Sequence, residues 1–246
     1  MRQLILSREE VFRGPLLLVN GEHPLTCAVR PALTDLNSAY GRILLEREAA
    51  ARLLACVRAA SGEGEILPVS GWRSREEQQS IWDDTLERNG EDFTRTYVAR
   101  PGCSEHETGL AIDLAQRAEE IDFIRPEFPY DGPCGAFRSL AARYGFIERY
   151  RADKQELTGI GQEPWHFRYV GAPHAVLMES NRLCLEEYGD FLRKSPRQVR
   201  TGGAAAWVCY IPCAGERTVV RVPDGPCQAA GDNVNGYYLT AWRWDR

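Results

Sequence analysis

Hydrophobic positions recur at helical spacing in several stretches of the chain. Between residues 34 and 61 they fall three and four apart, with Thr34 as a candidate N-cap, so a long helix is expected there. The same spacing predicts a helix at about 134–145. Pro173, a residue favoured in the first turn of a helix, predicts another that continues to about residue 194.

A short apolar strand followed by a helix is expected in the middle of the first half of the chain. Residues 65–71 are apolar and end in glycine, which predicts the strand. The next segment begins with Ser74 and Glu77 in capping-box spacing and ends at Gly90, which predicts the helix. Arg73 therefore lies on the turn between the two elements.

Two further segments alternate between apolar and polar positions, as half-buried strands do. In residues 110–114, two leucines and an isoleucine share one face, and Asp113 lies on the other. In residues 165–170, aromatic side chains share one face, and His166 and Arg168 lie on the other. Asp113 and His166 are thus each a polar member of a half-buried strand.

The character of the chain changes after about residue 194. We expect a main domain over 1–194, with an N-terminal extension over 1–30. Residues 195–203 have the composition of a linker, and 204–246 contain aromatic and β-branched residues between Gly, Pro, Asp and Asn turns. Such a short β extension is too small for a stable core, so it is expected to pack on the main domain.

Composition and charge exclude several classes of protein. Apolar residues make up 43% of the 246 residues and charged residues 26%, as in ordinary globular proteins. The net charge is −5, and lysines and arginines are scattered, which argues against nucleic acid as a partner. No stretch is apolar enough to span a membrane, so no membrane association is expected.

The first residues of the chain do not have the pattern of a signal peptide. Only four apolar residues in a row precede Arg8, so a cytoplasmic location is expected. Eight cysteines could pair as disulfides in a secreted protein. In the cytoplasm they are expected to be reduced thiols.

The candidate chemistry lies in the two alternating strands and the residues just before them. His106, Asp113 and His166 offer two imidazoles and one carboxylate, the ligand set of a catalytic zinc site that keeps one position open. Glu163 is placed to act as a base beside the metal without binding it. Because Pro164 follows it, Glu163 is expected on a loop that leads into the strand.

Each of these residues has an ordinary structural alternative when taken alone. A histidine beside apolar residues is commonly a hydrogen-bonded core residue, and Asp113 could cap a turn. The combination favours a metal site, because the chain has only four histidines and two of them lie in these two segments.

Three sequence blocks resemble a known family. SEHETGLAID (104–113), followed by EPWH (163–166), is similar to the paired signatures of the zinc D-Ala-D-Ala metallopeptidases. This family includes the vancomycin-resistance D,D-dipeptidases and D,D-carboxypeptidases and shares its metal fold with the hedgehog signalling domain. SGWRS (70–74) resembles a third block, with tryptophan in the place of the family tyrosine. The resemblance covers about residues 30–190.

The resemblance implies a fold and a role for each site residue. It implies an α+β fold in which a small antiparallel sheet carries the zinc site between helices, here with a short C-terminal β appendage. His106, Asp113 and His166 would bind Zn²⁺, Glu163 would be the general base and then the acid, and Arg73 would stabilise the oxyanion. The expected substrate-binding residues are Ser104, Gln78 and Trp165.

The leading hypothesis is therefore a zinc peptidase that hydrolyses bonds ending in D-alanine. The implied substrates are the D-Ala-D-Ala dipeptide and muramyl pentapeptide precursors, which would link the protein to glycopeptide resistance. Two alternatives stay open: a peptidoglycan endopeptidase of the endolysin type, and a non-catalytic zinc-binding interaction protein. The sequence does not choose between dipeptide and pentapeptide, does not identify a partner for the substrate amino group and does not indicate an oligomeric state.

Overall fold

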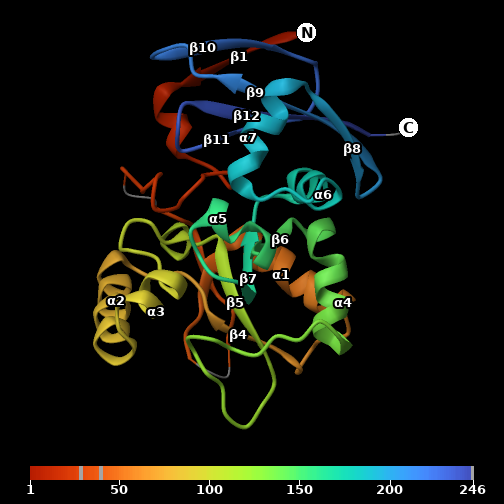
Figure 1. The fold of residues 1–246 in the computed structure, drawn as a ribbon. Coiled ribbons are helices and arrows are strands. Elements are labelled where there is room, and N and C mark those ends of the chain that lie inside the picture. The colour runs from red at the N-terminus through yellow and green to blue at the C-terminus, as the bar shows by residue number, and fades with distance from the viewer. Residues whose placement is uncertain (28–29, 39–40, 245–246) are drawn as a thin grey trace. The chain divides into compact units, whose positions relative to one another are not determined.

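Two compact units make up the chain in the computed structural model, which describes residues 1–27, 30–38 and 41–244. One unit is Val19–Tyr169. The other combines Met1–Leu18 with Val170–Arg246, so the two ends of the chain belong together (Figure 1). The change of composition after residue 194 predicted separate parts instead, but the first strand of the chain pairs with a strand at residues 217–222.

A four-stranded antiparallel sheet is the centre of the Val19–Tyr169 unit. Its strand order is β4-β5-β7-β6, with the strands spanning Ile66–Ser70, Ala111–Gln116, Glu163–Tyr169 and Phe146–Tyr150 respectively. In the register of β5 against β7, Asp113 pairs with His166. Strand pairing alone thus places two of the expected ligands directly opposite each other.

Helices flank this sheet, and most of its buried apolar side chains contact two of them. Figure 1 shows α1 (Arg47–Ala59) and α4 (Gly132–Ala141) on one side and α2 (Arg75–Asn89) and α3 (Glu91–Tyr97) on the other. The core between the sheet and α1 and α4 includes Leu53, Ile112, Phe137 and Phe167. The remaining elements of the unit are β2 (Leu33–Asp35), β3 (Leu44–Glu46), α5 (Gln155–Thr158) and the 3-10 turns η2 (Glu105–Thr108), η3 (Ala142–Tyr144) and η4 (Ala152–Lys154).

The expected helix over 34–61 is wrong in its first part. β2 and β3 pair as antiparallel strands, and Asn37 between them has a positive φ of 51° that no helix allows. The helix begins only at Arg47, because the Glu46 carboxylate accepts hydrogen bonds from two free N–H groups of the first turn. Residues 39–40 of the expected helix lie outside the described residues.

The helix expected after Arg73 is confirmed in detail. Ser74 caps α2, and its hydroxyl and backbone exchange hydrogen bonds with Glu77 as a capping box requires. Gly90 ends the helix at a φ of 83°. By contrast, the helix expected over 173–194 is two helices, α6 (Ala172–Ser180) and α7 (Leu185–Lys194), because Arg182 between them takes a positive φ of 54°.

The second unit contains two small antiparallel sheets. One has the order β11-β12-β9-β8, with strands Cys227–Gly231, Gly236–Trp244, Ala204–Pro212 and Arg197–Thr201. In the other, β1 (Arg2–Ser7), which leads into the 3-10 turn η1 (Arg8–Phe12), pairs with β10 (Arg217–Val222). The expected linker at 195–203 thus contains β8, which pairs along its whole length with β9 and buries Val199. Whether the β extension packs on the main domain stays a prediction.

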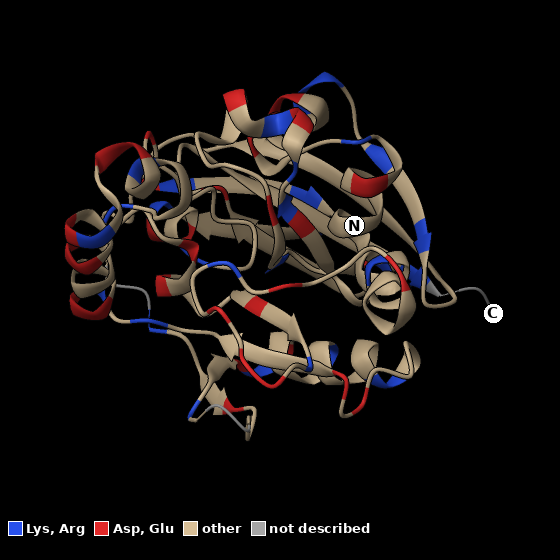
Figure 2. Cartoon of the chain, turned by 60° about the horizontal axis from the view of Figure 1, so that its bottom comes forward, with Lys and Arg blue, Asp and Glu red and all other residues tan. Residues whose placement is uncertain are grey.

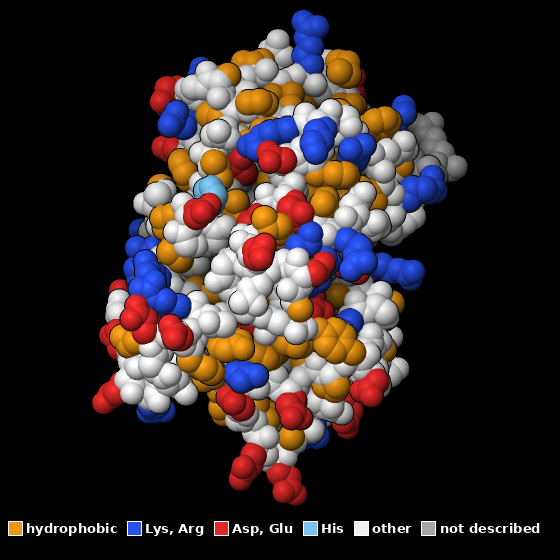
Figure 3. All heavy atoms as spheres, in the orientation of Figure 1, with side chains coloured by type: hydrophobic (Ala, Val, Ile, Leu, Met, Phe, Trp, Pro, Cys, Tyr) orange, Lys and Arg blue, Asp and Glu red, His pale blue; other side chains and the backbone are white. Residues whose placement is uncertain are grey.

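Charged side chains are mixed in sign over the described chain. Figure 2 shows acidic and basic residues interleaved along the helices and loops, and the face in Figure 3 carries both signs without a continuous basic stripe. Among the described helices, none combines the length and the apolar character that a membrane crossing needs. All eight cysteines are free thiols.

Candidate active site

A tight turn before β5 brings His106 to the same place as Asp113. η2 ends at Gly109, which takes the left-handed conformation with a φ of 73° and so turns the chain into β5. As a result, His106 Nε2 lies 3.2 Å from Asp113 Oδ2. Gly109 is tightly enclosed, because a Cβ at this position would lie 3.1 Å from Pro31 and Leu33.

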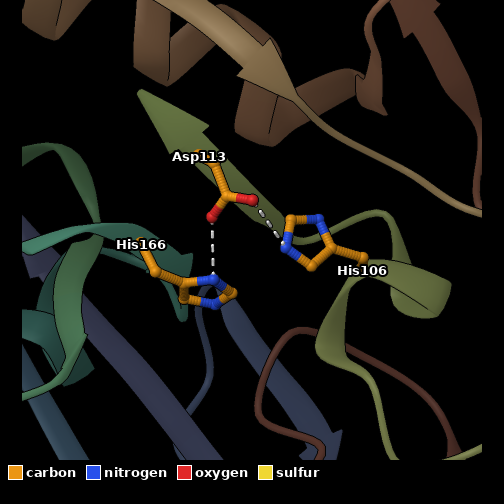
Figure 4. Close-up of side chains that lie close together, drawn as sticks. All are labelled: His106, Asp113 and His166. Atoms are coloured by element: carbon orange, nitrogen blue, oxygen red, sulfur yellow. Dashed lines mark ion pairs between the residues drawn. The ribbon is translucent and has the colours of Figure 1, made fainter. Parts of the chain in front are cut away.

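Asp113 lies between the two histidines (Figure 4). Its other oxygen, Oδ1, is 2.9 Å from Nδ1 of His166, which the sheet register places opposite. On the far side of its ring, His106 Nδ1 is 2.6 Å from the carbonyl oxygen of Gly71, a contact that requires Nδ1 to donate and leaves the Nε2 lone pair facing Asp113.

These three buried side chains fit a metal ion. One potential ligand atom from each lies within 4.8 Å of the others. Asp113 Oδ1 is a buried acceptor with no hydrogen-bond partner among the described residues. Two imidazoles and one carboxylate are also the donor set of a catalytic zinc site.

The pKa values of the cluster indicate where a proton resides when no metal is bound. Burial, reinforced by the nearby Arg73, lowers the pKa of His106 to about 4, so this ring is neutral. For His166, burial by itself lowers the pKa, but the nearby carboxylates of Asp113 and Glu105 outweigh it and raise the pKa to about 9. Burial raises the pKa of Asp113, yet the two histidines hold it well below its usual range. In the metal-free chain the proton of the cluster therefore resides on His166.

Glu163 is the first residue of β7, so its expected loop position is wrong. Pro164 is tolerated in the strand because the pairing of β7 with β5 begins only at His166, and the pairing with β6 is irregular opposite Pro164. The Glu163 carboxylate lies 3.6 Å from His166 Nδ1. Burial, to which the neighbouring Asp113 adds, raises the pKa of Glu163 to about 8, although His166 opposes the shift.

Arg73 lies on the turn after β4, as predicted, and reaches the cluster with its guanidinium. Its Nη2 is 3.0 Å from Asp113 Oδ2, and its Nε donates to the Ser70 hydroxyl at 2.9 Å. Its Nη1 donates to Gln78, whose own amide donates to the carbonyl of Ala99 at 2.8 Å. Gln78 thus holds the Arg73 guanidinium in place.

A cavity of about 240 Å³ opens onto the cluster. Arg73, Glu163 and the three potential ligands line it, together with Ser104, Gln78 and Trp165, so all the expected site residues meet in one place. Much of the rest of its lining is apolar. This part includes Ile81, Tyr97, Phe123, Ile124 and Ile160.

A buried ionic group behind the cluster was not predicted from the sequence. Glu105, next to His106 in the chain, accepts from Arg149 Nε at 2.8 Å and lies 2.9 Å from Arg168 Nη1. Burial raises the pKa of Glu105, but the two arginines outweigh it and hold the pKa far below its usual range. The polar face shared by His166 and Arg168 was a signal in the sequence, but no pattern there indicated which acid would meet that arginine.

The arrangement defines a class of protein. A carboxylate and two imidazoles that can bind a metal, with a buried glutamate beside them in a cavity, are the parts of a metal-dependent hydrolase. The family model described as "VanY: D-alanyl-D-alanine carboxypeptidase" matches residues 42–172. The chain belongs to this family.

Similar proteins of known sequence or structure agree with this assignment. The bifunctional D-Ala-D-Ala dipeptidase and D-Ala-D-Ala carboxypeptidase VanXYC of Enterococcus gallinarum is 42% identical over 74% of this chain and 97% of its own length. The vancomycin resistance D,D-dipeptidase VanXYg, solved in complex with a D-Ala-D-Ala phosphinate analog, is 44% identical in sequence to this chain. The two structures align with a TM-score of 0.94 over 98% of this chain and 99% of the VanXYg chain. The D,D-pentapeptidase VanY from a VanB-type resistance cassette, solved as a mutant in complex with Zn(II), is 32% identical. It covers 71% of this chain and 98% of its own, with a TM-score of 0.60.

Proposed function

We propose that this chain is a zinc-dependent peptidase that hydrolyses peptide bonds ending in D-alanine. One observation carries the proposal: three potential metal ligands and the Glu163 carboxyl converge on one cavity, in a chain that belongs to the D-alanyl-D-alanine carboxypeptidase family. His106, Asp113 and His166 would hold the ion. When bound there, zinc would polarise the scissile carbonyl and make hydroxide available near neutral pH.

Glu163 is the proposed general base and acid. Its carboxyl faces the cavity and lies next to the metal cluster. A carboxylate with a raised pKa accepts a proton more readily near neutral pH than an ordinary one does, and it can return that proton to the departing amine of D-alanine. A site that only binds a metal for structural reasons has no use for such a base.

Arg73 is the proposed stabiliser of the negative charge that develops on the carbonyl oxygen. A guanidinium suits this role because it keeps its charge at every physiological pH and offers several fixed donors. The contacts with Ser70 and Gln78 hold it at the rim of the cluster, so little reorganisation is needed during the reaction. Ser104, Gln78 and Trp165 are the proposed substrate-binding residues, since all three line the cavity.

The proposed substrates are the D-Ala-D-Ala dipeptide and soluble muramyl pentapeptide precursors in the cytoplasm. Two relatives support this choice of substrates. VanXYC is named a D-Ala-D-Ala dipeptidase and carboxypeptidase, and VanXYg a vancomycin resistance D,D-dipeptidase. A cytoplasmic location stays a prediction from the sequence.

The direct test is to measure D-alanine release from the free dipeptide and from the soluble pentapeptide precursor. We expect release from at least one of them, its loss with a zinc chelator, and its return when zinc is added back. Release from neither substrate would contradict the proposal. Cleavage of intact peptidoglycan without release from either would favour the endopeptidase alternative.

A further inference from the structure

Behind the metal cluster lies a group of three charged side chains that the proposed reaction does not use. Glu105, Arg149 and Arg168 each have 0% exposed side-chain surface. They come from η2, β6 and β7, the second and third of which are neighbouring strands of the central sheet. Burying ionised groups is costly and a weak source of stability, so a group of this kind calls for another explanation.

This group is directly connected to the ligands. Glu105 precedes His106 in the chain, and Arg168 follows His166 by two positions on the same face of β7. Both arginines bind Glu105 through its Oε1. The other oxygen, Oε2, lies 3.6 Å from His166 Nε2, and neither of these two atoms has a hydrogen-bond partner among the described residues.

The two histidines are therefore held in the same manner. Each presents one nitrogen to Asp113 and the other to a fixed oxygen: the Gly71 carbonyl for His106, and the Glu105 carboxylate for His166. Histidines that bind metals usually donate their second N–H to such an acceptor, which selects the tautomer and orients the ring. At 3.6 Å the His166 contact is longer than a hydrogen bond.

We propose that Glu105, fixed by Arg149 and Arg168, is a positioning residue that orients His166 for metal binding. The two arginines prevent the carboxylate from rotating, so Oε2 stays directed at Nε2. A proton on Nε2 facing this oxygen leaves the lone pair on Nδ1, the atom nearest to Asp113. The inference rests on the proposed function, since it assigns the residue that orients one ligand of that same site.

The chain contains a matched control two residues away. Glu107 is also buried on η2 and also pairs with an arginine, Arg75, at 3.1 Å. It accepts a hydrogen bond from the backbone N–H of Gly102 as well. None of its described hydrogen bonds or ion pairs reaches a histidine. Glu107 is therefore a buried, arginine-paired glutamate of the same short helix that lacks the proposed role.

The experiment compares zinc affinity in Glu105→Gln and Glu107→Gln, measured by competition with a chromophoric chelator. We expect Glu105→Gln to bind zinc roughly 10- to 100-fold more weakly than the unaltered chain, as is usual when an oriented ligand loses its partner. Glu107→Gln should bind zinc as the unaltered chain does. The absorption spectrum of the Co²⁺-substituted protein should change in Glu105→Gln alone, which a purely structural role would not cause.

A second pair of variants separates positioning from folding. Glu105→Gln removes the negative charge of the group, whereas Glu105→Gln with Arg149→Met restores its net charge. This double variant should fold and still bind zinc weakly, while Arg149→Met alone should bind zinc more tightly than either variant that lacks Glu105, because Arg168 still contacts the carboxylate. Equal affinities and Co²⁺ spectra in all these variants would overturn the inference and leave the proposed function intact. Failure of the unaltered chain to bind zinc would overturn both.

Discussion

At the scale of single residues, the site depends on how a few buried groups share protons. Asp113 is ionised between two imidazoles, and His166 carries the balancing proton because its pKa is raised to about 9. A metal ion and this proton compete for the same ring, since only a neutral imidazole can act as a ligand. Proton release on metal binding follows from the geometry.

We therefore expect zinc affinity to rise with pH. At pH 7 His166 is protonated in the metal-free chain, whereas His106, with its pKa lowered to about 4, is already neutral. Binding should release about one proton from His166 near pH 7. The increase of zinc affinity with pH should fade as the pH passes the pKa of His166. Calorimetric titrations in buffers of different ionisation enthalpy measure the number of protons. An affinity that does not change between pH 6 and pH 9 would contradict this prediction.

Glu163 is expected to be needed for turnover but not for zinc binding. Glu163→Gln keeps the size of the side chain but cannot accept a proton, so D-alanine release should fall by roughly 10²- to 10⁴-fold. Zinc binding should persist, because the three expected ligands remain. Kinetics on the dipeptide and pentapeptide, together with a zinc titration of the same preparation, test both parts. Unchanged turnover would show that another group moves the proton.

At the scale of elements, the site is assembled by one turn and one strand pairing. The turn at Gly109 returns His106 to Asp113, and the register of β5 on β7 places Asp113 opposite His166. A shift of that register by one residue would turn each side chain to the other face of the sheet. Apolar residues such as Ile112 and Phe167, which bury the opposite face against α1 and α4, oppose such a shift.

Replacing Gly109 should therefore damage both stability and metal binding. Gly109→Ala places a Cβ at a φ of 73° and close to Pro31 and Leu33, so a loss of roughly 1–2 kcal/mol is expected from the backbone conformation before the contacts are counted. Gly159→Ala is the control, because Gly159 takes the same left-handed conformation, with a φ of 72°, but has nothing within 4 Å of the added Cβ. Urea denaturation and zinc titration should show the larger loss in Gly109→Ala. Equal effects in both variants would argue against a role for the turn.

At the scale of the whole molecule, the site belongs to one of the two units. All the expected ligands, Glu163 and Arg73 lie within Val19–Tyr169, whereas the terminal strands belong to the other unit. A ligand that binds only the folded state stabilises the part of the chain that forms its site. Zinc should therefore act on the unfolding of the Val19–Tyr169 unit.

Thermal unfolding tests this expectation. At a free zinc concentration of about 100 times its Kd, binding should add about 2.7 kcal/mol to the stability of the Val19–Tyr169 unit. For a domain of this size such a gain raises Tm by several degrees. Calorimetric scans with zinc and with a chelator should show the shift, and Asp113→Ala should abolish it. An equal shift in Asp113→Ala would mean that zinc binds elsewhere.

The sequence alone predicted the residues of the candidate site and much of the local structure. The capping box of Ser74 and Glu77 and the alternation around Asp113 and His166 are local patterns, and the structure bears them out. Local patterns were insufficient where distant partners decide the outcome. Residues 33–46 pair as strands instead of extending a helix, and β8 forms in an expected linker, because each strand gains its hydrogen bonds from a partner.

Tertiary structure alone decided which charges meet in the interior. No spacing in the sequence connects Glu105 with Arg149 or the first strand with β10, because these contacts join residues far apart in the chain. The pKa values of Glu163 and His166 likewise depend on burial and on neighbours that come together only in the fold. The sequence by itself determined which side chains are candidates for the site, and the fold determined how their charges and protons are arranged, because burial and the contacts between distant residues exist only in the folded chain.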